Sequence, residues 1–127
     1  MDARGLQNYK AQSLNTMTQG ELLILLLDEL VKRLMRGDIA LEQGDIPLFE
    51  TSIQRCIDIV RYLDDTLDRR YEVSRGLHRL YDFFCYDLNR IIIGRNKTEL
   101  DKLRPMITDL RDTFRIAEKN TSSQNSR

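Results

Sequence analysis

The sequence has few of the residues on which most enzymes and metal proteins depend. Its 127 residues include no Trp, two Cys, two Pro and one His. The Glu-x-x-His pairs of di-iron bundles are excluded, because Arg75 stands three residues before His78. No CxxC spacing suggests a zinc site, and no Ser or Cys nucleophile has an evident base. We therefore expect a protein that is not an enzyme and that binds neither a metal nor a cofactor.

Charge of one sign is not in excess. Lysine plus arginine equals aspartate plus glutamate at 20 each, so the formal net charge is zero. This balance argues against binding to nucleic acid or to an anionic membrane, because both require a basic surface.

Long hydrophobic runs are also missing. The longest, residues 22–27, is far shorter than the ~20 residues that span a bilayer, so we expect no membrane insertion. The first ten residues, MDARGLQNYK, lack the apolar region of a secretory signal. We therefore expect a cytosolic protein, in which Cys56 and Cys85 are reduced, buried thiols.

Apolar residues recur at steps of three and four, the period of amphipathic helices. The four segments with this pattern cover approximately residues 18–43, 49–67, 73–92 and 100–117. The spacings Thr18 to Glu21 and Asn96 to Glu99 are typical of helix N-termini. Pro105 should kink or break the fourth helix.

Only short connections separate the four segments. They predict an all-α fold, an antiparallel up-down four-helix bundle over residues 18–119. We expect an N-terminal extended or capping segment at 1–17. The polar residues 120–127 are expected to form a disordered tail.

The first helix has more apolar surface than one bundle core needs. Leu23, Leu26, Leu27, Leu30 and Leu34 cluster on one side at about 100° per residue. A second stripe, roughly a quarter turn or more away, and further apolar residues off the main stripe of the third helix predict a hydrophobic groove that binds a partner. The groove residues predicted in this way are Ile24, Val31, Met35, Phe83 and Tyr86.

Other apolar residues lie off the main stripes of the second and fourth helices, namely Ile59, Tyr62, Met106 and Ile116. Packing in a tight bundle that leaves some apolar residues outside is the alternative explanation of these positions. Leu6, Tyr9 and Leu14 punctuate the polar segment before the first helix, and we expect them to cap the groove. A disordered leader is the alternative for that segment.

Four stretches resemble the flagellar export chaperones of the FliS family. They are YKAQSLNT at 9–16, ELLILLLDEL at 21–30, LDRRYEVSRGLHRLYDFF at 67–84 and LRDTFRIA at 110–117. The sequence departs from the family pattern in places: Phe114 replaces the usual Trp, and Glu72 and Val73 replace a Gly-Gly pair. These departures leave the expected fold unchanged.

The resemblance implies a cytosolic chaperone for flagellin. Such proteins hold the C-terminal disordered segment of flagellin, prevent premature polymerisation and present it to the type III export gate. The resemblance also implies that the segment with Tyr9 covers the groove until flagellin arrives.

Two other functions were considered. A histidine phosphotransfer bundle is disfavoured, because Asp82 stands four residues after His78, where an acid would repel a phosphohistidine. A self-associating structural or assembly bundle stays open, since the second stripe could form a dimer instead of a partner site. We expect a monomer or a weak dimer.

Overall fold

Four helices make up the part of the chain that a computed structural model describes, residues 17–125 with the side chains of 17–121. Helix α2 spans Gln19–Glu42, α3 spans Ile46–Asp65, α4 spans Val73–Gly94 and α5 spans Lys97–Asn125. No strand occurs within these residues. The prediction of an all-α fold is therefore confirmed.

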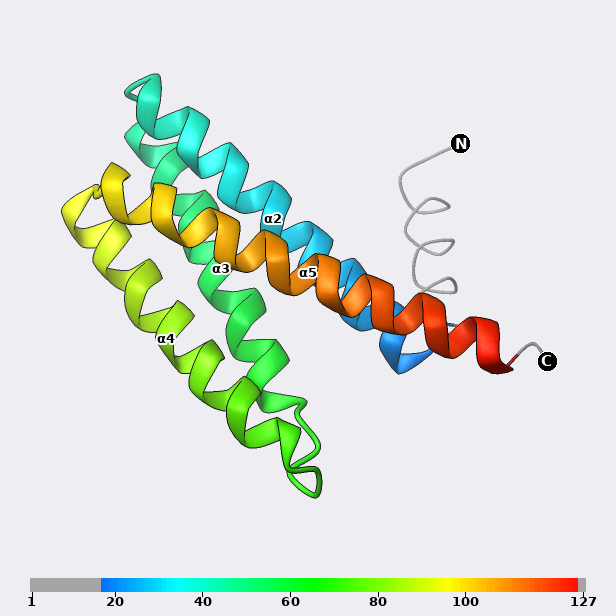
Figure 1. Cartoon of the computed structure of the whole chain (residues 1–127). Helices are drawn as coiled ribbons and strands as arrows, with labels where there is room; N and C mark the ends of the chain where they lie inside the picture. The colour runs from blue at the N-terminus through cyan, green and yellow to red at the C-terminus, as the bar shows by residue number, and fades with distance from the viewer. Residues whose placement is uncertain (1–16, 126–127) are drawn as a thin grey trace, which may run out of the picture.

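The helices form an antiparallel up-down bundle, as predicted (Figure 1). Helix α3 packs between α2 and α4, and α5 returns to lie along α2. Short turns force neighbouring helices to run antiparallel, because the chain must reverse within a few residues. Helix α4 ends and α5 begins at the turn after Gly94, and the two helices diverge away from that turn (Figure 1).

Local side-chain chemistry fixes the helix ends. The backbone N–H of Glu21 donates to Thr18 Oγ1 at 3.1 Å, and that of Glu99 donates to Asn96 Oδ1 at 3.1 Å. Each bond satisfies one of the donors that a helix N-terminus leaves free. Helix α4 ends at Arg95, whose φ of 48° is left-handed. Both predicted N-caps are therefore confirmed.

Helix α5 differs from the expectation at two places. Pro105 does not break it, since the helix is continuous from Lys97 to Asn125. The carbonyl of Asp101, which loses its helical partner, belongs to an exposed residue that water can reach. The helix also extends past Lys119, into the segment for which a disordered tail was predicted. Residues 118–125 contain neither Gly nor Pro, so their polar composition alone does not end a helix.

The core contains residues from all four helices, and its positions follow the predicted stripes. Leu30, Phe49, Phe84 and Ile107 are each 0% exposed. Burial of one such side chain contributes about 1.5–3 kcal/mol, so this cluster is the main source of stability. Val73, the first apolar residue of the third predicted segment, departs from its pattern, since it is 67% exposed at the start of α4.

The two thiols differ in burial. Cys56 is completely buried in α3, and burial raises the pKa of its thiol to about 12. Cys85 is only half-buried in α4. Both are free, and Cys56 is an unreactive part of the core.

A buried ion pair joins the end of α2 to the start of α5. Asp38 is 5% exposed and contacts the ammonium of Lys97 and, at 2.5 Å, the guanidinium of Arg104. Lys97 also pairs with Glu42 at 2.9 Å and with Asp101 at 3.0 Å. The hydrogen bonds with Asp38 and then Glu42 raise the pKa of Lys97 above its ordinary value. This cluster supplies the cation that the last turn of α2 lacks.

Candidate functional site

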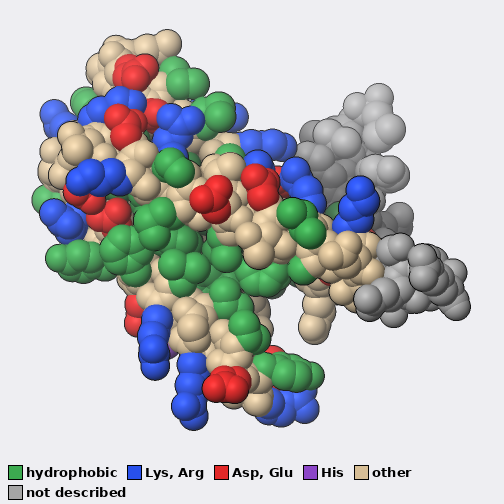
Figure 2. Space-filling model, viewed as in Figure 1, with side chains coloured by type: hydrophobic (Ala, Val, Ile, Leu, Met, Phe, Trp, Pro, Cys, Tyr) green, Lys and Arg blue, Asp and Glu red, His purple; other side chains and the backbone are tan. Residues whose placement is uncertain are grey.

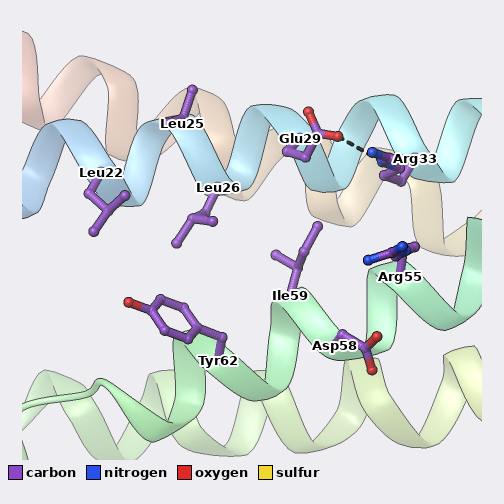
Figure 3. Close-up of a pocket in the computed structure, with 9 residues that line it drawn as sticks. All are labelled: Leu22, Leu25, Leu26, Glu29, Arg33, Arg55, Asp58, Ile59 and Tyr62. Carbon is purple, nitrogen blue, oxygen red and sulfur yellow. Dashed lines mark hydrogen bonds and ion pairs between the residues drawn. The ribbon is translucent and has the colours of Figure 1, made fainter. Parts of the chain in front are cut away.

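A groove with a volume of about 530 Å³ runs between α2 and α3 (Figure 3). Its two walls are antiparallel, so residues near the start of α2 face residues near the end of α3. The residues that line it are Leu22, Leu25, Leu26, Glu29 and Arg33 of α2 and Arg55, Asp58, Ile59 and Tyr62 of α3.

The floor and the rim of this groove differ in burial. Leu26 and Ile59 pack against the core and form the floor. Leu25 and Tyr62 stand at the rim and are 40% and 48% exposed. Large apolar side chains exposed together around a groove mark an interaction surface rather than a solvated helix face.

One end of the groove is charged. Arg33 Nε donates to Glu29 Oε1 at 2.7 Å, and the side chain of Asp58 accepts from the Gln54 amide at 3.1 Å. Arg55 makes no ion pair or side-chain hydrogen bond with any residue in 17–121. The groove therefore combines an apolar part with a cation that lacks a partner within the described chain.

A second pocket of about 300 Å³ continues the groove at the end where α2 begins. Leu22, Leu26 and Tyr62 line both spaces, so the two share a wall. Gln19, the first residue of α2, also lines this end pocket. Tyr81 closes it from α4, and burial, followed by the charge of Asp64, raises the pKa of its phenol to about 12, which keeps the hydroxyl neutral.

The predicted α2 residues lie on a different flank of the helix. Ile24, Val31 and Met35 are centred about 150° around the helix from the leucines that line the groove. They share the flank that faces α5, where Asp28 pairs with Arg115 at 2.5 Å. Met35 is 46% exposed, while Val31 is half-buried and packs against the core.

The predicted α4 residues lie on yet another surface. Phe83 and Tyr86 are 43% and 63% exposed, and the guanidinium of Arg90 lies 5.7 Å from the Tyr86 ring centroid. Helix α4 packs against α3 and α5, not beside α2. The structure therefore does not bring the five predicted residues together in one groove.

Apolar surface is nevertheless present where α4 and α5 diverge. In Figure 2, hydrophobic side chains form a band across this face of the molecule. Exposed apolar residues of these two helices include Phe83, Ile93 and Met106. The predicted capping residues Leu6, Tyr9 and Leu14 lie outside the described residues.

One protein family matches almost the whole chain. The family described as flagellar protein FliS matches residues 2–121. The chain belongs to this family. The resemblance predicted from the four sequence stretches is thereby confirmed.

Two curated relatives of this FliS-family chain are both named flagellar secretion chaperone FliS. The Bacillus subtilis (strain 168) protein is 28% identical over 109 residues, which cover 86% of this chain and 82% of the relative. The Vibrio cholerae protein is 26% identical over 113 residues, which cover 84% of this chain and 81% of the relative. The similarity thus extends over most of both proteins.

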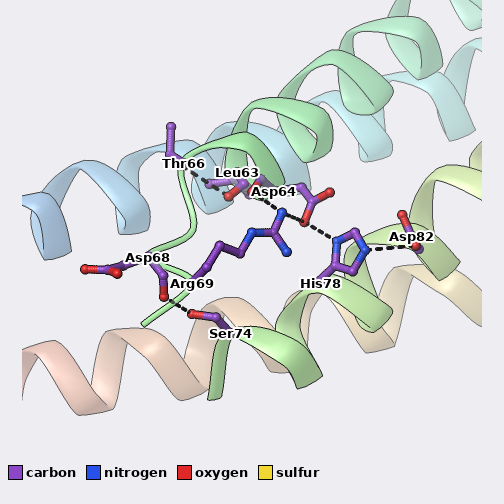
Figure 4. A network of polar contacts seen from close by, with 8 residues as sticks. All are labelled: Leu63, Asp64, Thr66, Asp68, Arg69, Ser74, His78 and Asp82. Carbon is purple, nitrogen blue, oxygen red and sulfur yellow. Dashed lines mark hydrogen bonds and ion pairs between the residues drawn. The ribbon is translucent and has the colours of Figure 1, made fainter. Parts of the chain in front are cut away.

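A polar cluster at the α3–α4 junction of this FliS-family bundle is the one group of possible metal ligands in its described part. Figure 4 shows His78 between two carboxylates. Its Nδ1 lies 2.7 Å from Asp64 Oδ1, and its Nε2 lies 3.4 Å from Asp82 Oδ2. Arg69 is 3.6 Å from the same Asp64 oxygen. Because His78 and Arg69 already contact these carboxylates, we assign the cluster to the joining of α3 and α4.

Among the residues described, no helix is both long enough and apolar enough to cross a bilayer.

Proposed function

We propose that this FliS-family protein is a cytosolic export chaperone that holds the C-terminal segment of flagellin in the α2–α3 groove. Holding that segment prevents premature polymerisation and presents the client to the type III export apparatus. There, export-gate components would interact with the chaperone. The mechanism is binding and release, without a covalent step. Membership of the family and the names of its curated relatives support this proposal.

The observation that carries the proposal is the exposed apolar groove between α2 and α3 (Figure 3). An amphipathic client helix that lies in such a groove buries its apolar residues at i, i+3, i+4 and i+7. A client segment that is disordered when free pays its ordering entropy on binding, so the apolar contacts must supply the affinity. Leu25 and Tyr62, exposed at the rim, are the contacts that a client would bury.

Leu25→Glu is expected to weaken binding of the flagellin C-terminal segment by at least about tenfold, because a carboxylate would be buried against apolar side chains. Calorimetric titration of the full chain with the C-terminal segment of flagellin from the same genome measures the dissociation constant. Met35→Glu is the matched control: Met35 is on the same helix and is 46% exposed, compared with 40% for Leu25. We expect the control to change affinity by less than about twofold, which is less than about 0.4 kcal/mol of binding free energy.

Weaker binding by Met35→Glu together with normal binding by Leu25→Glu would place flagellin on the flank predicted from the sequence, with Ile24, Val31 and Met35. Equal, unchanged binding by both variants would refute the α2–α3 groove as the client site. Far-ultraviolet circular dichroism and urea unfolding of both variants would show that each retains the fold.

We further propose that the N-terminal segment covers the end pocket until a client displaces it. The segment contains Leu6, Tyr9 and Leu14, and Gln19, which follows it, lines that pocket. A competing intramolecular segment lowers the apparent affinity, because the client binds only the uncovered fraction.

Deletion of residues 1–15 is therefore expected to tighten flagellin binding several-fold, by about threefold or more, in the same titration. A full-length chain in which Leu6, Tyr9 and Leu14 are all replaced by Ser should give the same increase. Unchanged or weaker binding by both forms would contradict the capping role.

The second candidate function is that of a self-associating assembly bundle. The exposed apolar side chains of α4, with Ile93 at 84% exposed, favour it as an alternative. Sedimentation equilibrium separates the two functions. A mass that rises with protein concentration and is unaffected by the flagellin segment would favour self-association, whereas the chaperone is expected to stay monomeric until its client is added.

A further inference from the structure

The α2–α3 groove is polarised along its length (Figure 3). Leu22 and Leu26 face Tyr62 at one end, with Leu25 at the outer rim, whereas Arg33 of α2 lies across from Arg55 of α3 at the other end. A bound helix that fills the apolar end therefore extends past two guanidinium groups. The groove thus distinguishes the two ends of an occupant.

The charges at the polar end are not equally available. Glu29 already accepts a hydrogen bond from Arg33 at 2.7 Å. The carboxylate of Asp58 is directed away from α2 in Figure 3 and accepts from Gln54 at 3.1 Å. Arg55 lies between the two helices and has no ion-pair partner in the described part of the chain. The charged group that remains available to an occupant of the groove is therefore a cation, the Arg55 guanidinium.

We infer that the client segment has an acidic side chain that binds the Arg55 guanidinium while its apolar face fills the other end of the groove. This inference rests on the proposed function. A guanidinium matches a carboxylate with two parallel hydrogen bonds, which gives the contact direction as well as energy. The acid sets the register and direction of the client in a groove whose apolar part alone would tolerate sliding.

The spacing of the groove residues specifies where the acid lies in the client. Arg55 and Tyr62 are seven residues apart on α3, which is about 10 Å along a helix. A client helix therefore presents its Asp or Glu about seven or eight residues from its first apolar anchor. An apolar helix without an acid at that distance would bind more weakly.

Arg55→Gln is expected to weaken binding of the flagellin C-terminal segment by about five- to tenfold, since it removes the charged hydrogen bonds and leaves a shorter, neutral polar side chain. Arg79→Gln is the control, because Arg79 is exposed on α4 and its replacement removes the same charge outside the groove. Calorimetric titrations at two salt concentrations measure both. The wild type and Arg79→Gln should lose affinity with added salt, and Arg55→Gln should lose less.

The client is then changed one acid at a time, Asp to Asn and Glu to Gln. One such change is expected to weaken binding to the wild type and to have no further effect on Arg55→Gln. If Arg55→Gln and Arg79→Gln bind as well as the wild type, while Leu25→Glu still weakens binding, the acid contact is refuted and the flagellin groove stands. If Leu25→Glu also binds normally, the α2–α3 groove is refuted as the client site; if the wild type does not bind the segment at all, the proposed function itself fails.

Discussion

Phe84→Ala is expected to lower the free energy of unfolding by about 3–5 kcal/mol, the usual cost of removing a buried phenyl ring and leaving a cavity. Phe84 is 0% exposed and packs within the core that all four helices share. The marginal stability of a domain of this size makes such a loss a large fraction of the total. Urea unfolding, followed by circular dichroism, gives the difference from the shift in midpoint.

Phe83→Ala is the matched control for this change. The two residues are adjacent, and their ring centroids are 6.2 Å apart, but Phe83 is 43% exposed. Its removal should cost less than about 1.5 kcal/mol, because much of its surface already faces water. Equal losses from the two substitutions would mean that α4 is rotated from the orientation described.

The contrast between Phe83 and Phe84 shows what the helical period can predict. A period of 3.6 residues assigns Phe84 to the stripe with Leu88 and Ile91, and all three are buried. The same period leaves Phe83 off the stripe, where it is exposed. Helix existence, direction and core positions depend on this local pattern, so they could be predicted from the sequence.

The position of the groove could not be predicted in the same way. Helix α2 has apolar residues on several flanks. A helical wheel gives the angle of each residue around the axis but does not show which helix packs against each flank. Leu26 was assigned to the core, against which it does pack, but its second role as the floor of the groove was not predicted, and Leu25 was assigned to no stripe. The uninterrupted apolar run at 22–27 and the off-stripe Ile59 and Tyr62 were the available signals.

The wall that the groove shares with the end pocket links the two proposed roles of this region, client binding and capping. Leu22, Leu26 and Tyr62 line both spaces, so one ligand that enters either of them changes the walls of the other. A capping segment in the end pocket and a client in the groove would therefore compete for the same three side chains. This geometry provides a direct physical route for regulation of client binding by the N-terminal segment.

Asp38 was not predicted, because its partners are distant in sequence. Lys97 and Arg104 lie 59 and 66 residues away from it, on a helix whose position depends on the whole fold. In a sequence with 31% charged residues, a single aspartate gives no sign of burial. Tertiary packing alone distinguishes it from the solvated acids on the same helix.

Asp38→Asn is expected to lower the free energy of unfolding by about 2–3 kcal/mol. The substitution preserves the shape of the side chain and removes the charge that both cations share. The cost should be below the 3–5 kcal/mol typical of a fully buried pair, because the side chains of Lys97 and Arg104 are 38% and 36% exposed and can turn to water. Urea unfolding at pH 7 measures the difference.

Asp101→Asn tests whether burial, not pairing, makes the Asp38 contact strong. Asp101 pairs with the same ammonium of Lys97 at 3.0 Å, but its side chain is 53% exposed. An exposed pair one helical turn apart contributes about 0.5 kcal/mol or less, because water and salt screen it and both side chains lose freedom. The Asp38 variant should therefore unfold at a clearly lower urea concentration than the Asp101 variant. If the two midpoints coincide, the Asp38 cluster does not hold α2 against α5, and the apolar contacts of these two helices must do so alone.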